Sequence, residues 1–361
     1  MKNQNTTVSR LLAVAILLMS GVMAAATNSA LATELGAPQE EKTRNTDDQR
    51  SIRNQMSKYQ KAYPGIDFRL LSSHEDYKAL MPLEKALGAG VANVDYEHPD
   101  TLRTTLVEAQ EYRIGLMIEN EMGSATLFHT PQETISGKQY TCLITIDSSL
   151  LRNASWLIAS QYLYDLDRRT IESMPERLRF SHQDVLLYTL NHEVFHCIDV
   201  YLNGFLFAQT DDPFKASYDR RRAEIRADIF AVISHLSRQP SDSRFLANLA
   251  LARTIQLLNG DTEHYSSDAI NLIESDYQAD KDPDIEFLVN SAFMFYKASS
   301  ITYEEHRELL AAMQVVNHRF GMENEETGDD AHLADDKPDL ERVDALAKKI
   351  RIAINSVNGN L

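Results

Sequence analysis

The spacing of apolar residues along the chain changes at about residue 147. Before this point, short runs of apolar and β-branched residues are separated by turns that contain glycine. These runs predict the strands of a small mixed or antiparallel sheet, at residues 112–118, 125–129 and 139–146. Two short helices are expected upstream, at residues 74–87 and 99–110.

After residue 147 the apolar positions recur with the three- and four-residue spacing of helices. Helices are predicted at residues 150–166, 182–203, 217–237, 242–258, 266–276, 283–298 and 302–319. An acidic run follows at residues 321–337, and a last helix is expected at 339–355. With only 13 Gly and 10 Pro in 361 residues, long helices are favoured. The expected fold class is α+β, with a small N-terminal sheet and a mostly helical C-terminal part.

The N-terminal segment has the pattern of a signal peptide. Two basic residues precede an uncharged run of 16 residues from Leu11 to Ala26, and a small-x-small sequence ends at Ala32. The run is shorter than the roughly 20 residues of a membrane-spanning helix. We therefore expect residues 1–32 to be removed, the mature protein to be periplasmic or secreted, and no stable membrane insertion after cleavage. Residues 33–50 are polar and predict a flexible leader.

Composition narrows the possible partners. The chain has 36 Lys and Arg against 53 Asp and Glu, a net charge of −17, which argues against nucleic acid as a partner. It has two cysteines, Cys142 and Cys197. In an oxidising compartment an even count favours a disulfide, whereas two buried thiols are the alternative. No feature of the sequence indicates an oligomeric state.

One predicted helix carries the pattern His192-Glu193-Val-Phe-His196. Residues four apart on a helix point within about 40° of one another, so both imidazoles can reach one ion at the Zn–N distance of about 2.0–2.1 Å. Glu193 points about 100° away, where it can accept a proton from water on the metal without binding the metal itself. The alternative is two core histidines that are satisfied by backbone carbonyl groups.

A tetrahedral catalytic site needs a third protein ligand. The metzincin spacing is excluded because Asp199 and Leu202 stand where that class has its glycine and third histidine. Glu224 follows His196 by 28 residues and is followed four residues later by Asp228, on one face of the next predicted helix. Glu224 would bind the metal, and Asp228 would accept a hydrogen bond from a ligand histidine. Alternatively, both acids belong to a solvated face that pairs with neighbouring arginines.

Together, these two motifs resemble the gluzincin branch of zinc metallopeptidases, the thermolysin-like arrangement of H-E-x-x-H followed by E-x-x-x-D. The resemblance covers about 50 residues of the 361. It implies one Zn²⁺ per chain held by His192, His196 and Glu224, with Glu193 as general base and Asp228 behind the ligands.

The resemblance also implies a zincin-like catalytic region, which we place at residues 51–320, before an acidic linker and C-terminal helix at 321–361. Thermolysin-like enzymes use a tyrosine ahead of the glutamate helix and a histidine beyond it to stabilise the oxyanion. Tyr218 and His264 are the candidates here, although their spacings match the family imperfectly. Ordinary surface or core roles are the alternative for both.

Two further expectations depend on the zincin resemblance. Cys142 lies in a predicted strand, and Cys197 lies in the helix of the first motif. If the fold resembles a zincin, this strand packs against this helix, which predicts a disulfide between the two cysteines. Zincins also pair an extended peptide with a sheet edge beside the active-site helix. Residues 139–146 or 125–129 could supply that edge, or could equally be ordinary core strands.

The sequence thus predicts an exported zinc metallopeptidase that acts on peptide or protein substrates. Two alternatives remain: a non-catalytic zincin scaffold with a binding or inhibitory role, and a zinc hydrolase of another amide or ester. Glu193 favours an enzyme, because a purely structural metal site needs no base beside an open coordination position.

Overall fold

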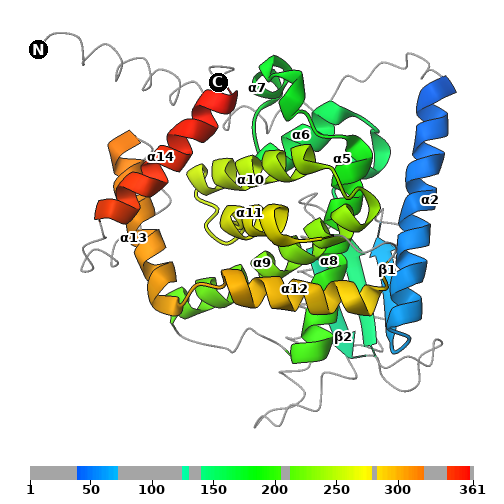
Figure 1. Ribbon diagram of the computed structural model, residues 1–361. Helices are drawn as coiled ribbons and strands as arrows, with labels where there is room; N and C mark the ends of the chain where they lie inside the picture. The colour runs from blue at the N-terminus through cyan, green and yellow to red at the C-terminus, as the bar shows by residue number, and fades with distance from the viewer. Residues whose placement is uncertain are drawn as a thin grey trace, which may run out of the picture.

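The computed structural model describes residues 39–71, 124–129, 140–204, 212–278, 283–320 and 340–357, which form a mostly helical molecule with one small sheet (Figure 1). This confirms the α+β class. The expected signal peptide, the helices at 74–87 and 99–110, the strand at 112–118 and the acidic run at 321–337 lie outside the described residues. Within the described ranges, none of the helices combines the length and apolar character needed to cross a membrane.

The first described element is a long helix, α2 (Gln39–Ala62). It includes residues 39–50, so the prediction of a flexible leader is corrected there. These residues lack glycine and proline, and the helix is held by a few contacts in its second half rather than by a continuous apolar stripe. The buried Tyr59 donates a hydrogen bond of 2.6 Å to Oδ1 of Asn191, in the central helix of the fold.

The sheet has three strands, β1 (Ile66–Leu71), β2 (Ser124–His129) and β3 (Tyr140–Thr145). Their order is β1-β3-β2, with β1 parallel and β2 antiparallel to β3. The mixed sheet and two of its strands are therefore confirmed. Because β3 is paired on both sides, the segment at 139–146 cannot supply a free edge. β1 was not predicted, although its apolar and polar residues alternate over Ile66–Leu70.

The remaining elements are helical: α5 (Ser148–Arg152), α6 (Trp156–Tyr164), α7 (Arg168–Ser173), a 3₁₀ turn (Glu176–Leu178), α8 (His182–Asn203), α9 (Pro213–Arg238), α10 (Ser243–Leu258), α11 (Ser267–Asp276), α12 (Ile285–Ser299), α13 (Tyr303–Phe320) and α14 (Leu340–Val357). The six helices predicted between residues 182 and 319 and the helix predicted at 339–355 are all present.

Local capping explains where the helices differ from prediction. The single helix predicted at 150–166 is divided into α5 and α6, because Asp147 and Ser155 each accept a hydrogen bond from the backbone at the start of a new helix. α9 begins four residues before the predicted residue 217, since Asp212 caps it and Pro213 occupies its first turn.

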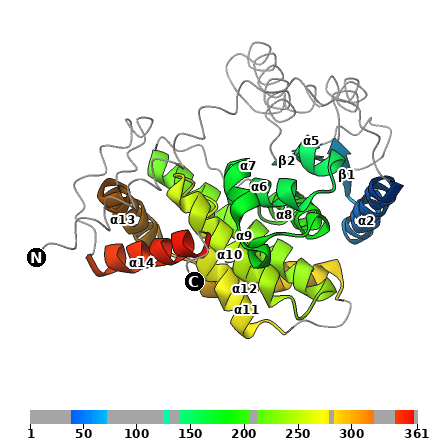
Figure 2. The ribbon, with the colours of Figure 1, turned by 90° about the horizontal axis from the view of Figure 1, so that it is seen from above.

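The helices pack around α8, which contacts the sheet on one side and α9 on another. α12 covers α9, and α10 and α11 lie next to each other (Figures 1 and 2). A separate apolar cluster joins the end of α10 to α13 and α14. In both views α2 lies at the opposite end of the molecule from α13 and α14.

Candidate metal centre

The helix α8 carries the first motif and begins and ends at the predicted residues. The Ser181 side chain accepts a hydrogen bond from the backbone of Asp184, and Gly204 ends the helix with a φ of 75°. His192 and Glu193 are only 5% and 6% exposed. Polar groups at this depth are costly unless they find partners.

Three donor atoms converge between α8 and α9. Nε2 of His192 lies 3.1 Å from Nε2 of His196 and 3.0 Å from Oε2 of Glu224. Nε2 of His196 lies 3.4 Å from the same carboxylate oxygen. One ligand atom from each of the three side chains lies within 4.8 Å of the others, so together they could hold one metal ion.

The chemistry of this donor set fits zinc. Zn²⁺ prefers imidazole nitrogen and carboxylate oxygen, and three protein ligands leave a position of the tetrahedron open. The structure thus brings together the three ligands that the sequence predicts. A closed structural site would need a fourth donor, and no further His, Cys, Asp or Glu belongs to this group in the part of the chain that the structure describes.

Asp228 supports the first ligand from behind. Its Oδ1 lies 2.8 Å from Nδ1 of His192, and Arg253 donates hydrogen bonds of 2.6 and 2.8 Å to its two oxygens. The hydroxyls of Tyr188 and Ser266 also donate to this carboxylate. Burial raises the pKa of Asp228, but the charges and hydrogen bonds of Arg253 and His192 together outweigh it and hold the pKa well below its usual range. The ionised carboxylate favours a proton on Nδ1 of His192 and leaves Nε2 free to bind metal.

The electrostatics of the ligands suit a cation. Burial lowers the pKa of His192, but hydrogen bonds to Asp228 and Glu224 raise it to about 9. Burial raises the pKa of Glu224, but the neighbouring His196 and His264 bring it well below its usual value. Positive charge is therefore favoured at this point, and a metal ion that binds here displaces protons.

Glu193 lies beside the donor group without belonging to it. Burial raises the pKa of its carboxyl group, although positive charge on His192 and His196 opposes the shift. A carboxylate with a raised pKa is a better proton acceptor near neutral pH. Its place beside the donor group, and not in it, agrees with the position expected of Glu193 from helix geometry.

His264 is brought to the centre, whereas Tyr218 is not. Nε2 of His264 lies 3.1 Å from Oε2 of Glu224, and its ring stacks on that of His192 with centroids 6.3 Å apart. The hydroxyl of Tyr218 instead donates a 2.9 Å hydrogen bond to the carbonyl of Ile301. The assignment of Tyr218 as an oxyanion donor is therefore corrected, because the hydroxyl is used to attach the segment before α13.

The sequence analysis missed two supporting residues, Arg253 and Asp261. Arg253 is the one charged residue between Phe245 and Leu258, in an otherwise mostly apolar helix. A charge in such a run signals a buried partner, so this residue could have been found. Oδ2 of Asp261 lies 2.8 Å from Nδ1 of His264, an arrangement that only the shape of the loop between α10 and α11 creates.

A disulfide joins Cys142 of β3 to Cys197 of α8, with the Cα atoms 5.9 Å apart. Both cysteines are buried, but they are bonded to each other, so the alternative of two buried thiols does not hold in this structure. Because Cys197 directly follows His196, the bond ties the central strand to the ligand-bearing helix beside the metal centre.

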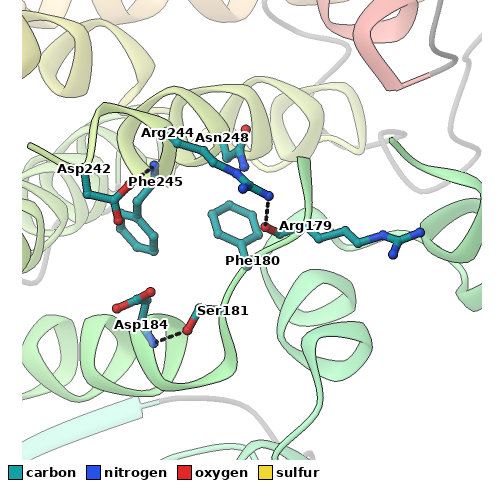
Figure 3. Close-up of a pocket in the computed structure, with 8 residues that line it drawn as sticks. All are labelled: Arg179, Phe180, Ser181, Asp184, Asp242, Arg244, Phe245 and Asn248. Carbon is teal, nitrogen blue, oxygen red and sulfur yellow. Dashed lines mark hydrogen bonds between the residues drawn. The ribbon is translucent and has the colours of Figure 1, made fainter. Parts of the chain in front are cut away.

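A cavity of about 210 Å³ lies apart from this centre, at the N-terminal ends of α8 and α10 (Figure 3). Asp184, Asp242 and Arg244 line it together with Phe245. Arg244 donates hydrogen bonds to backbone carbonyls before α8, and Asp242 caps α10. These side chains therefore serve the ends of helices, and none of the candidate catalytic residues reaches the cavity.

Comparison of the chain with protein-family models, characterised protein sequences and solved structures gave no significant match. Functional assignment therefore depends on the geometry of the centre.

Proposed function

We propose that the chain is a zinc-dependent hydrolase of the gluzincin type that cleaves peptide bonds. The observation that carries this proposal is the convergence of His192, His196 and Glu224, with a buried glutamate next to the donor group and outside it. A structural metal site has no use for such a base.

The protein side chains have separate roles in this proposal. His192, His196 and Glu224 would hold the zinc, which supplies Lewis acidity toward the scissile carbonyl and activates water. Glu193 accepts the proton of the attacking water and passes it to the nitrogen of the leaving amine. The raised pKa of the Glu193 carboxyl suits it to both transfers.

His264 is the proposed donor to the oxyanion that develops on the carbonyl oxygen. Its Nδ1 contacts Asp261, and its Nε2, which lies 3.1 Å from Oε2 of Glu224, would turn to the substrate once that carboxylate holds the metal. Burial lowers the pKa of His264, but Glu224 and Asp261 raise it well above its usual value, so the surroundings favour a proton donor at this position. A positioned, charged donor is the usual means of stabilising such an oxyanion.

The sheet supports a peptide as the substrate. α8 packs against β2, and β2 is the strand next to this helix with one side unpaired among the described residues. An extended peptide can add to such an edge through backbone hydrogen bonds. We therefore place the substrate along β2 (Ser124–His129), which agrees with one of the two edges expected from the sequence.

Export is part of the same proposal. The N-terminal signal-like segment supports it, as does the disulfide, because disulfides persist in oxidising compartments.

The test measures zinc content and hydrolysis of a mixed peptide library by the purified full chain. We expect about one zinc per chain, and hydrolysis that stops with a chelator and returns with added zinc. Glu193→Gln at equal zinc occupancy should be inactive, whereas Glu172→Gln, in an exposed helix, should match the wild type. Zinc binding without turnover of any peptide would support a binding scaffold. Turnover of simple amides or esters without turnover of any peptide would support the remaining alternative, a zinc hydrolase of another amide or ester.

A further inference from the structure

Arg221 is a buried cation whose acidic neighbour, Asp268, acts on it without forming an ion pair. It is 5% exposed and lies on α9, one turn before Glu224. No carboxylate forms an ion pair with it in the described part of the chain, and its Nε has no hydrogen bond. Burial lowers its pKa to about 10. Because burying an unpaired charge costs stability, its position calls for a role other than stabilisation of the fold.

The bonds that Arg221 does make join two distant segments. Nη2 donates to the backbone carbonyl of Tyr265 at 3.2 Å, and Nη1 donates to Nδ1 of His306 at 3.3 Å. Tyr265 directly follows His264 in the loop between α10 and α11. Arg221 therefore holds the backbone beside the proposed oxyanion donor.

His306, in the first turn of α13, holds the other end of this contact. Since arginine can only donate, Nδ1 of His306 must accept, and its protonated Nε2 faces Oγ of Ser217 at 3.4 Å. The groups of α9 that face the ring are Ser217, Arg221 and the ring of Tyr218, at 5.6 Å between centroids. Burial and the charge of Arg221 lower the pKa of His306 to about 4, so it stays a neutral acceptor.

The side chain of Tyr265 completes the attachment. Its ring lies in the apolar cluster formed by the end of α10 with α13 and α14, and Lys349 of α14 lies 3.4 Å from its hydroxyl. Arg221 of α9 thus holds the backbone carbonyl of Tyr265, and the C-terminal helices α13 and α14 hold the side chain of the same residue.

We propose that Arg221 and His306 are positioning residues that hold His264 against Glu224, so that α13 and α14 serve as a clamp for the active-site loop. The effect on catalysis rests on the proposed function, whereas the effect on the loop does not.

The first experiment measures hydrogen exchange of the peptide that spans residues 259–266 in the purified full chain. Arg221→Met and His306→Leu should speed exchange of this peptide about tenfold or more, with α8 unchanged. His306→Gln keeps a neutral acceptor and should behave as wild type. Arg222→Met is the matched control, because this neighbouring arginine donates to Tyr296 of α12 instead. Unchanged exchange in folded Arg221→Met overturns the proposal.

The second experiment tests whether the effect passes through His264. Arg221→Met should lower kcat roughly 10- to 100-fold with little change in KM or zinc content. In a protein that already carries His264→Ala, the added Arg221→Met should lower kcat almost no further. A full additional loss in the double variant would show a general structural defect and overturn the proposal. If Arg221→Met does not fold, the comparison of His306→Leu with His306→Gln decides the question. If the wild type hydrolyses no peptide, the exchange measurements still decide whether the clamp exists.

Discussion

Nδ1 of His192 lies 2.8 Å from Oδ1 of Asp228, and the same carboxylate receives two hydrogen bonds from Arg253. One buried acid therefore orients a candidate metal ligand on one side and neutralises a buried arginine on the other. Its loss should weaken metal binding and folding together.

Asp228→Asn should lower zinc affinity about 10- to 100-fold, because the amide does not hold the proton on Nδ1 as an ionised carboxylate does. It should also lower the free energy of unfolding by about 3–5 kcal/mol, because Arg253 is left buried without a counter-charge. Competition with a zinc chelator and urea denaturation measure the two effects. The control is Asp219→Asn on the same helix, where the carboxylate pairs with Lys215 at 2.7 Å and does not face the centre. Equal zinc affinity in Asp228→Asn and wild type would contradict the assignment.

Glu224→Ala should lose the zinc during dialysis, since two imidazoles alone do not complete a stable site. Metal content by mass spectrometry is the measurement. Glu263→Ala, a change of the same type at the glutamate that pairs with Arg220, should retain the metal. Full retention by Glu224→Ala would mean that another side chain is the third ligand.

The disulfide should account for a large share of the stability. Cys142 and Cys197 are 55 residues apart, and closing a loop of this length in the unfolded chain corresponds to about 4 kcal/mol. The double variant Cys142→Ala/Cys197→Ala should therefore unfold at a clearly lower denaturant concentration. Denatured, unreduced wild type should show no titratable thiol, and two thiols there would refute the bond.

His306 should make stability fall in acid. Its pKa is lowered to about 4 in the folded protein, against about 6.5 in the unfolded chain. Between these values the unfolded state binds more protons, so stability decreases as the pH falls from about 6.5 to about 4 and is independent of this group at higher pH. His306→Gln should remove on the order of 2 kcal/mol of this pH dependence, measured by denaturation at pH 7 and pH 4.5. Parallel curves for the two proteins would show that His306 does not titrate in this way.

Those parts of the fold that depend on local patterns could be predicted from the sequence. The residues that start and stop α8, the capping Ser181 and the terminal Gly204, directly flank the helix in the sequence. The four-residue spacing of His192 and His196 places both side chains on the same face of this helix. Glu224 and Asp228 could be found for the same reason, because their four-residue spacing on a helix also places both side chains on one face.

The failures involve contacts between distant segments. α2 is held through single residues such as Tyr59, too few to form an apolar stripe in the sequence. Tyr218 was expected at the centre only because of the resemblance to thermolysin-like enzymes, and its hydroxyl is instead bonded to Ile301, in the segment that precedes α13. The lone charge of Arg253 in an apolar helix signals a buried partner, but no local pattern says that this partner is Asp228, 25 residues away on another helix.

The contact between Tyr59 and Asn191 also has a consequence for the order of folding. The two residues are 132 positions apart, so among the described elements α2 has only β1 to contact until α8, against which it also packs, has been synthesised. At 5–20 residues per second this interval is roughly 7 to 26 seconds. β1 waits in the same way for β3, because Ile66 pairs with Tyr140. α2 and β1 thus leave the ribosome well before the elements that they pair with, and α2 completes its contacts only after α8 has been made.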